Sequence, residues 1–290
     1  MKGIILAGGK GTRLSPLTSV VCKQLLPVYN KPMIYYPLST LLLVGIRDIL
    51  IITNPNEDLI FKKLFGDGSN LGCKITYAIQ EKPNGLAEAF IIGEKFIGKD
   101  RVCLILGDNI FYGNNFGQIL RDNIKKSLPF VIGIPSKNPS NYGVAKLSAN
   151  GDLIEIIEKP KDPPSETIIP GIYFYDNEVI KISKTITPSE RGELEITSIN
   201  NYYIKKRKLK IVNFERGVVW FDTGNIDDLM NASEFIKNIE LRSNKKIGCI
   251  EEIAILKGYI NSNDLNHDKF NNSDYYNYLK NFIKYHNIKK

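Results

Sequence analysis

The chain has 290 residues and carries 39 Lys and Arg against 31 Asp and Glu, giving a formal net charge of +8 at pH 7. Its content of 43% hydrophobic and 24% charged residues is typical of a globular chain and excludes wholesale disorder. Because no apolar run approaches the roughly 18–20 residues of a membrane span, and residues 2–7 are too short for a signal peptide, we expect a cytoplasmic protein with no membrane partner.

The first half of the chain alternates predicted strands and helices. In chain order these are strand 2–7, helix 34–44, strand 48–53, helix 57–65, strand 75–79, helix 86–96, strand 102–106, helix 116–126 and strand 130–134. Such alternation indicates βαβ units and an α/β fold, with a Rossmann-like, mostly parallel sheet covered by helices on both faces. Right-handed crossovers then place the functional loops at the carboxyl ends of the strands.

The pattern changes after about residue 140. The predicted elements are a hairpin of strands 144–147 and 153–157, strand 168–175, helix 193–205, strand 210–214 and helix 227–242. Asn150-Gly151 is a strong hairpin signal, and Pro170-Gly171 interrupts the strand that contains it. From about residue 244 the chain is polar, with short helical pieces.

Cysteine, histidine and basic residues narrow the chemistry. The cysteines at positions 22, 73, 103 and 249 have no close pair, so they predict buried thiols rather than a zinc site or disulfides. The histidines at positions 267 and 286 are far from every glycine-rich motif, so no Ser-His or Cys-His pair is expected in the main body. The positive charge fits either nucleic acid or anionic small molecules. Since no nucleic-acid motif is recognisable, we expect no nucleic-acid partner.

The segment Leu6–Leu14 (LAGGKGTRL) follows the first predicted strand. Its three glycines allow a tight turn that brings N–H groups against an anion, and Lys10 and Arg13 add positive charge. A Walker A loop would need a glycine where Ile4 stands, and the dinucleotide fingerprint would need one at Leu14. The segment therefore predicts a phosphate-binding loop of neither common kind.

This loop and the segments after it resemble the signature of the sugar-phosphate nucleotidylyltransferases. The matching segments are 8–14, 16–18, 23–28, 31–34, 80–89, 106–113, 142–144, 158–160, 171–176, 191–197 and 220–224, within about residues 1–260. The resemblance implies transfer of a thymidylyl group from dTTP to glucose 1-phosphate, which gives dTDP-glucose and pyrophosphate and begins dTDP-deoxysugar synthesis. The sugar phosphate, already anionic near pH 7, would attack the α-phosphorus in line without a histidine base.

The resemblance also implies a division of the chain. Residues 1–243 would form the catalytic domain, with a nucleotide half at about 1–135 and a small β-rich sugar-binding half at about 136–243. Residues 244–290 would form a helical segment for oligomer contacts and regulation. A homotetramer and feedback inhibition by a deoxysugar nucleotide are expected from the resemblance alone.

Two aspartates predict a site for Mg²⁺. Asp108 follows the strand at 102–106, and Asp222 follows the apolar run at 218–221. Mg²⁺ prefers one or two carboxylates together with phosphate oxygens and water. An isolated Asp at a strand end is more often a turn residue, but both positions match the metal-binding aspartates of the family.

The resemblance assigns further site residues by their match to family motifs. The nucleotide-binding positions are Leu6, Gly8, Gly9, Gly11, Thr12, Arg13, Gln24, Gln80, Pro83, Gly85, Leu86 and Asp108. The sugar-phosphate-binding positions are Tyr142, Gly143, Glu158, Lys159, Gly171, Tyr173 and Arg191. The catalytic positions are Arg13, Lys23, Asp108, Lys159, Arg191 and Asp222.

Several alternatives remain open at this point. A uridylyl-transferring relative is the nearest, because thymine and uracil differ by one methyl group, although Lys23-Gln24 favours thymidylyl transfer by analogy. Another sugar 1-phosphate is a second alternative, and a catalytically silent nucleotide-sugar sensor is a third. A nicotinamide oxidoreductase is disfavoured because the third glycine of its fingerprint is missing. Pro170, which precedes Gly171 where the family often has a small polar residue, cannot donate a backbone hydrogen bond.

Overall fold

The structure, a computed structural model, describes residues 1–9, 11–214, 216–265 and 272–288, so Lys10 and His267 lie outside the described residues. The strands are β1 (Lys2–Ala7), β2 (Pro27–Val28), β3 (Lys31–Pro32), β4 (Asp48–Thr53), β5 (Lys74–Ile79), β6 (Val102–Leu106), β7 (Asn109–Gly113), β8 (Phe130–Pro135), β9 (Gly143–Leu147), β10 (Leu153–Glu158), β11 (Thr167–Ile169), β12 (Ile172–Tyr175), β13 (Lys210–Asn213) and β14 (Val218–Asp222). The α-helices are α1 (Tyr35–Val44), α2 (Asp58–Phe65), α3 (Glu88–Ile92), α4 (Glu94–Ile97), α5 (Phe116–Lys125), α6 (Glu178–Ser183), α7 (Ile196–Lys205), α8 (Ile226–Ser243), α9 (Ile250–Leu256) and α10 (Asp274–Ile288). Short 3₁₀ helices are η1 (Thr12–Leu14), η2 (Leu17–Ser19), η3 (Lys23–Leu25), η4 (Ser69–Leu71), η5 (Pro139–Asn141) and η6 (Ser262–Asp264).

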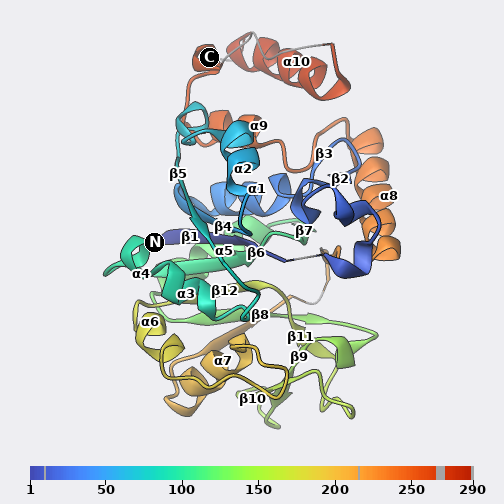
Figure 1. Ribbon diagram of the computed structural model, residues 1–290. Helices are drawn as coiled ribbons and strands as arrows, with labels where there is room; N and C mark the ends of the chain where they lie inside the picture. Colours follow the sequence, from blue (N-terminus) through green and yellow to red (C-terminus); the bar gives the residue numbers. More distant parts are fainter. Residues whose placement is uncertain (10, 215, 266–271, 289–290) are drawn as a thin grey trace.

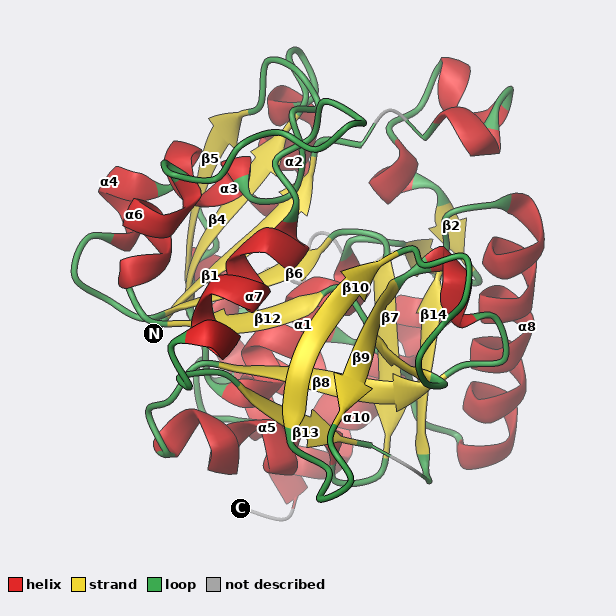
Figure 2. Ribbon diagram, turned by 90° about the horizontal axis from the view of Figure 1, so that it is seen from below, coloured by secondary structure: helices red, strands yellow, loops and turns green. Residues whose placement is uncertain are grey.

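The described residues form a ten-stranded central sheet in the order β10-β9-β11-β8-β12-β6-β1-β4-β5, with β13 beside β8. Strands β6, β1, β4 and β5 run parallel, as the alternation of elements predicts. Strand β12 pairs antiparallel with β6 and β8, and the β9–β10 hairpin closes around Asn150-Gly151. The prediction of a Rossmann-like α/β sheet with a β-rich insertion is confirmed (Figure 2).

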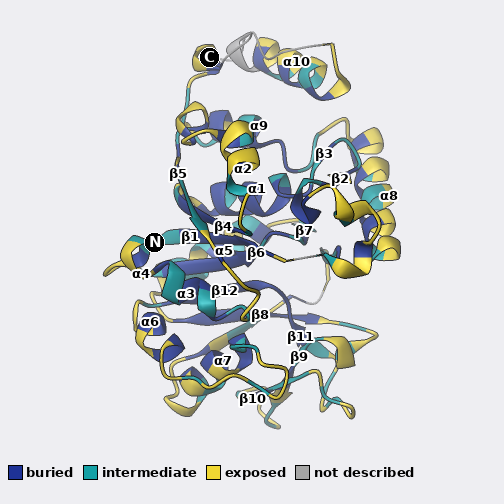
Figure 3. Cartoon of the chain, viewed as in Figure 1, coloured by how far each residue is buried: buried dark blue, intermediate teal, exposed yellow. Residues whose placement is uncertain are grey.

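Alternate residues of the central strands build two cores on opposite faces of the sheet. Ile5 and Ile51 are fully buried in a core that includes residues of α1, α2, α5 and α9. Ile4 and Ile52 are fully buried in the other core, with residues of α3, α6 and α7. Figures 1 and 3 show this arrangement as a buried sheet between two helical layers. Successive side chains of a strand point to opposite faces of the sheet, so a continuous apolar strand contributes to both cores.

Four local features differ from the sequence prediction. The helix predicted at 86–96 is divided at Gly93 into α3 and α4. A Cβ at Gly93 would lie 2.9 Å from Ala89 O and from Ile4 Cδ1, so this glycine allows close packing of the break against β1. Pro170-Gly171 separates β11 from β12 completely. Helix α6 and strand β7 were not predicted.

Strand β7 pairs antiparallel with β14 in a separate two-stranded ribbon. The register places Asp222 opposite Asn109, directly after Asp108. Helix α8 begins three residues beyond β14, and Asn225 caps it by accepting a hydrogen bond from the Asp228 N–H at 2.9 Å. The ribbon thus brings two segments more than a hundred residues apart to one edge of the sheet.

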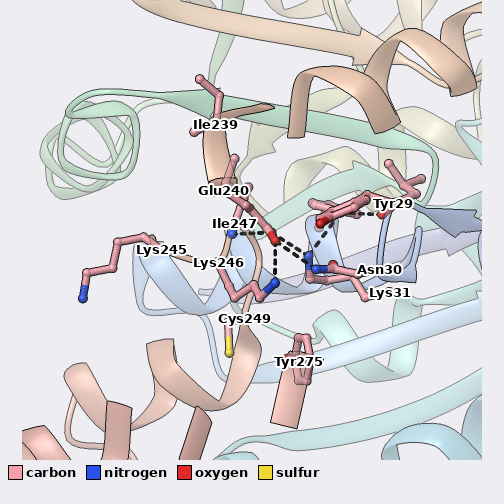
Figure 4. A network of polar contacts seen from close by, with 12 residues as sticks. Tyr29, Asn30, Lys31, Ile239, Glu240, Lys245, Lys246, Ile247, Cys249 and Tyr275 are labelled. Atoms are coloured by element: carbon pink, nitrogen blue, oxygen red, sulfur yellow. Dashed lines mark hydrogen bonds and ion pairs between the residues drawn. The ribbon is translucent and has the colours of Figure 1, made fainter. Parts of the chain in front are cut away.

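The C-terminal segment is tied to the body by a buried polar network (Figure 4). Lys31 of β3 donates to Glu240 near the end of α8 at 3.0 Å, and each side chain is only 2% exposed. Lys246 pairs with Glu240 at 3.1 Å and also with Asp274 at the start of α10. The network therefore joins the β2–β3 hairpin, α8 and α10.

Two expectations about composition can be compared with the structure. All four cysteines are buried and unpaired, as predicted. Over the described ranges, no helix combines the length and the apolar content needed to cross a bilayer.

Candidate functional site

Two adjoining cavities open at the carboxyl ends of β1, β5 and β6. The smaller, of about 200 Å³, lies against the first glycines after β1 and against Gln80, which follows β5. The larger, of about 530 Å³, extends toward β9–β12 and the β7–β14 ribbon. Leu86, Leu106, Asp108 and Glu193 line both cavities. Both cavities therefore lie at the edge of the sheet that the right-handed crossovers predict for functional loops.

The smaller cavity collects most of the residues predicted for nucleotide binding. It is lined by Leu6, Gly8, Gly9, Gln24, Gln80, Pro83, Gly85, Leu86, Leu106, Asp108 and Glu193. Arg13, predicted with the same set, instead lines the larger cavity. Gly11, Thr12 and the buried Lys23 line neither cavity as the described residues define them.

Gly11 shapes the path of the glycine-rich loop rather than its lining. Its φ of +62° is left-handed, and a Cβ there would lie 2.8 Å from the Thr18 side chain and 3.1 Å from that of Lys23. Thr18 Oγ1 donates to the Gly11 carbonyl at 2.8 Å. The glycine thus lets the loop fold back against Lys23, which a bulkier residue would prevent. Thr12 begins the 3₁₀ turn that carries Arg13.

The rim of the smaller cavity is fixed by a close backbone approach at Gly85. This residue has a φ of +107°, and a Cβ there would lie 2.5 Å from both the N and the O of Leu194. Leu194 N donates to Asn84 O at 2.7 Å, and Ala87 N donates to Leu194 O at 3.1 Å. Only glycine fits between these two segments. Residues 84–87 and the loop that carries Arg191 are therefore hydrogen-bonded to each other.

Asp108 lies at the junction of the two cavities, held by partners from several elements. It forms an ion pair with Lys23, and it accepts from Asn109 Nδ2 at 2.9 Å. Asn109 Oδ1 in turn accepts from Gly171 N at 3.0 Å and from Trp220 Nε1 at 2.7 Å. The Asn109 amide thus links the aspartate both to Gly171, between β11 and β12, and to strand β14.

Asp222 is placed beside the same junction by β14. A Cβ at Gly224 would lie 2.8 Å from Arg13 Nη2 and 3.1 Å from Asp222 Oδ1, so the absence of a side chain admits the guanidinium next to the carboxylate. Thr223 Oγ1 donates to Asp108 O at 2.8 Å, which fixes the two aspartate segments together. Both predicted metal-binding aspartates therefore line the larger cavity.

The two carboxyl groups have opposite pKa shifts. Burial alone would raise the pKa of Asp108, but the Lys23 ammonium and the Asn109 amide hold it below its usual value. The pKa of Asp222 is raised to about 6, chiefly by burial and next by the negative charge of Asp108. A cation between them would relieve this repulsion. Although no cluster of three His, Cys, Asp or Glu ligands occurs among the described residues, two carboxylates fit Mg²⁺, which takes its other ligands from phosphate and water.

The larger cavity collects every residue predicted for the sugar phosphate. Those residues are Tyr142, Gly143, Glu158, Lys159, Gly171, Tyr173 and Arg191. Glu158 accepts from Thr197 Oγ1, which orients its carboxylate. A Cβ at Gly171 would lie 2.5 Å from the Leu106 side chain and 2.7 Å from Asn109 Oδ1. Tyr142 packs edge-on against Trp220, with ring centroids 5.0 Å apart. The lining therefore combines carboxylate, amide and aromatic groups suited to a hydroxylated ring.

The cations of this cavity are held in two different ways. Arg191 donates to Glu195 at 2.7 Å and lies 3.6 Å from Glu158 and 3.8 Å from Glu193. The Glu195 hydrogen bond is the main cause of a raised Arg191 pKa. Lys159 is exposed at the cavity edge, where its φ of +43° turns the chain after β10. Both cations can therefore contact an anion in the cavity. Arg191 is held in place by its carboxylate partners, whereas Lys159 is exposed to solvent.

Some lining residues were not predicted. Asn109, Glu195, Thr197 and Trp220 lie within quoted family segments, but no role was assigned to them. Their contacts join β7, α7 and β14, which are distant in sequence. The position of Asn109 directly after a candidate metal ligand was the one local signal.

Comparisons with known proteins show which family the chain resembles. The family model described as Nucleotidyl transferase matches residues 2–239. A glucose-1-phosphate thymidylyltransferase of Mycolicibacterium smegmatis is 51% identical over 265 residues, covering 91% of this chain and 92% of that protein. One of Neisseria meningitidis is 50% identical over 266 residues, with the same two coverages.

Solved structures share the fold. A structure from Bacillus anthracis, described as a candidate glucose-1-phosphate thymidylyltransferase in complex with sucrose, has a TM-score of 0.74 and 40% identity, covering 81% of this chain and 94% of that one. A UDP-glucose pyrophosphorylase complexed with UDP-glucose has a TM-score of 0.72 at 23% identity, covering 82% and 98%. The latter likeness concerns the fold alone.

Proposed function

Since the chain belongs to the nucleotidyl transferase family, we propose that it transfers a thymidylyl group from dTTP to glucose 1-phosphate, giving dTDP-glucose and pyrophosphate. The observation that carries the proposal is the junction at Asp108, where a cavity lined by glycines and Gln80 meets a cavity lined by carboxylate, amide and aromatic groups. The names of the relatives at about 50% identity support the same substrates.

The reaction is an in-line displacement that requires positioning more than proton transfer. A phosphate oxygen of glucose 1-phosphate bonds to the α-phosphorus of dTTP, and the bond to the bridging oxygen breaks as pyrophosphate leaves with the electron pair. The nucleophile is already anionic, so no general base is needed. The protein must instead hold two polyanions together and stabilise charge in the transition state.

The cations around the junction offset the repulsion between substrates. Two like charges 4 Å apart repel by roughly 4 kcal/mol at an effective dielectric constant of 20. Arg13 lies beside Asp222 at Gly224, while Arg191 and Lys159 line the sugar side. Arg191 offers a planar fork for a phosphate, and Lys159 a compact charge. Lys23 is already paired with Asp108, so its role is to keep that carboxylate ionised and fixed.

Asp108 and Asp222 are the residues that would hold Mg²⁺. When bound, the ion would neutralise phosphate charge and orient the α-phosphoryl group. Asp108 is kept ionised by Lys23, and Asp222 is kept close by the hydrogen bond from Thr223 to Asp108 O. Arg13, on the other side of Asp222, would contact the phosphates themselves.

The test is pyrophosphate release by the purified protein with glucose 1-phosphate and Mg²⁺, comparing dTTP, UTP, ATP, CTP and GTP. We expect the strongest signal with dTTP and a weaker one with UTP, because one methyl group is worth only about 1–3 kcal/mol in a pocket. UTP preferred over dTTP would assign the chain as a uridylyltransferase. Nucleotide binding without pyrophosphate release would indicate a silent sensor instead.

The remaining proposals concern the oligomeric state, the cellular location and the regulation of the chain. We propose a cytoplasmic homotetramer in which residues 244–290 contribute to contacts between subunits and to feedback inhibition by a deoxysugar nucleotide. Their support is the family resemblance. Light scattering of the purified chain would test the tetramer, and dTDP-deoxysugars added to the assay would test the inhibition.

A further inference from the structure

The amide of Gln80 is held in the smaller cavity by a carboxylate outside it. Gln80 is 4% exposed and directly follows β5. Its Nε2 donates to Glu88 Oε2 at 2.8 Å and also lies 3.3 Å from Gly85 O. Glu88, the first residue of α3, accepts a second hydrogen bond at 2.7 Å from Asn84 Nδ2. Glu88 is not itself among the residues that line either cavity.

This contact fixes which end of the amide faces the cavity. An ionised carboxylate can only accept hydrogen bonds, so the NH₂ end of Gln80 must face Glu88 and the oxygen must face away. The oxygen lies over Gly8, where a Cβ would be only 2.8 Å from Gln80 Oε1. Within the part of the chain that the structure describes, no donor is bonded to this oxygen. Gln80 therefore presents an acceptor to the cavity beside Gly8.

Gln24, which also lines the smaller cavity, is oriented the other way. Its Oε1 accepts from Cys22 Sγ at 3.0 Å. Burial, reinforced by the charge of Glu57, raises the pKa of the Cys22 thiol to about 12, so the sulfur keeps its proton and remains a donor. Gln24 Nε2 is consequently the end that lies toward Gly9. The cavity thus offers one acceptor and one donor from its two glutamines.

We propose that Glu88 is a positioning residue that sets base selectivity by holding the Gln80 amide with its oxygen toward the base. Thymine and uracil carry an N–H at ring position 3, which this oxygen can accept. Cytosine carries an unprotonated nitrogen there, which the oxygen repels. Glu88 thereby favours dTTP and UTP over dCTP without touching the nucleotide. This inference rests on the proposed function, because it assumes that the smaller cavity holds the base.

The experiment compares kcat/KM for dTTP and dCTP in the wild-type chain and in Glu88→Ala. Alanine is the best helix former for the first turn of α3. It removes the charged acceptor of the Gln80 amide and leaves only the longer contact with Gly85 O. A charge-assisted hydrogen bond favours one amide orientation by about ten- to hundredfold. We therefore expect the dTTP-to-dCTP ratio to fall by about tenfold or more, mainly through KM, while kcat for dTTP changes by less than about threefold.

Two further variants separate positioning from a structural role. Glu88→Gln keeps an acceptor oxygen within reach of Gln80 and should retain most of the wild-type ratio. Glu81→Ala removes an exposed carboxylate from the same loop and should leave the ratio unchanged. An unchanged ratio in Glu88→Ala, or equal losses in Glu88→Ala and Glu88→Gln, would overturn the proposal.

The dissociation constants of dTTP and dCTP are measured by calorimetry on the same proteins. These constants report the orientation of Gln80 even where turnover is absent. A wild-type chain that binds dTTP but turns over no nucleotide would refute the proposed function and leave this inference to be decided by the binding ratio. A wild-type chain that turns over dTTP, with no change of ratio in Glu88→Ala, would refute this inference alone.

Discussion

Replacing Glu240 by glutamine should destabilise the fold far more than a surface substitution would. Glu240 accepts from Asn30 Nδ2 at 2.9 Å, Lys31 Nζ at 3.0 Å and Ile247 N at 2.9 Å, and it pairs with Lys246 at 3.1 Å (Figure 4). Glutamine keeps an acceptor oxygen but removes the charge. Lys246 keeps its ion pair with Asp274. The Lys31 side chain is only 2% exposed, and its ammonium loses the ion pair with the Glu240 carboxylate.

The expected loss of stability follows from the Lys31 ammonium, which stays buried without a carboxylate partner. Removing one partner of a buried ion pair costs about 3–5 kcal/mol, because the other charge stays buried and uncompensated. Since burial already lowers the pKa of Lys31 and Glu240 is what opposes that shift, we expect Glu240→Gln to lie in this range. Adding Lys31→Met should recover more than half of the loss, because the double variant has no unpaired ammonium at this position.

The assay is equilibrium unfolding in urea followed by far-ultraviolet circular dichroism. Glu94→Gln is the matched control, because Glu94 pairs with Lys184 on the surface, where the two side chains are 48% and 46% exposed. It should change stability by less than about 0.5 kcal/mol. A loss below about 1 kcal/mol in Glu240→Gln, or a double variant less stable than that single variant, would refute the reasoning.

Three further predictions concern the active site and the pH dependence of stability. Asp108→Asn and Asp222→Asn should each abolish pyrophosphate release while leaving the circular dichroism spectrum unchanged. Normal activity with unaltered Mg²⁺ dependence in either variant would contradict the assignment of these residues as metal ligands. Gly85→Ala should raise the KM for dTTP at least tenfold, because the new Cβ would lie 2.5 Å from the Leu194 backbone at a left-handed φ, and a wild-type KM would contradict the close approach. Burial, the first cause at each site, raises the pKa of Cys22 to about 12 and of Tyr142 to about 12. Thiols and phenols of the unfolded chain ionise near pH 8.5 and 10, so the unfolded state then binds fewer protons than the folded state and stability falls with rising pH above about 8.5. Urea midpoints under reducing conditions that stay constant from pH 8 to 10.5 would disagree.

The sequence predicts the elements whose signals are local. The strand predicted at residues 48–53 from its apolar run matches β4, and Asn150-Gly151 matches the β9–β10 turn. The glycine-rich loop can also be recognised locally, because its three glycines allow a tight turn that brings N–H groups against an anion and two cations lie beside them. Such features depend on neighbours within a few residues, so they can be recognised without knowing the rest of the fold.

Other features depend on partners far along the chain. Strand β7 follows the turn at Asp108 directly and finds its partner β14 more than a hundred residues later, so no periodicity marks it. Asn109 links Asp108 to Gly171 and Trp220 through hydrogen bonds that form only in the folded chain, because both partners are distant in sequence. The break at Gly93 likewise depends on the Ile4 side chain of β1. Family motifs gave most of the site residues, but the hydrogen bonds that orient them could be learned only from the fold.

The hydrogen bonds between Leu194 and residues 84–87 join the two loops that are proposed to hold the two substrates. On that assignment, a base resting against Gly85 would restrain the segment that carries Arg191, and a sugar phosphate held by Arg191 would restrain Gly85 in return. Ordering that the first ligand imposes on both loops need not be repeated for the second. By thermodynamic linkage, the factor by which bound dTTP raises the affinity for glucose 1-phosphate equals the factor by which bound glucose 1-phosphate raises the affinity for dTTP. On the proposed assignment, the two cavities would therefore fill as a cooperative pair, whichever substrate arrives first.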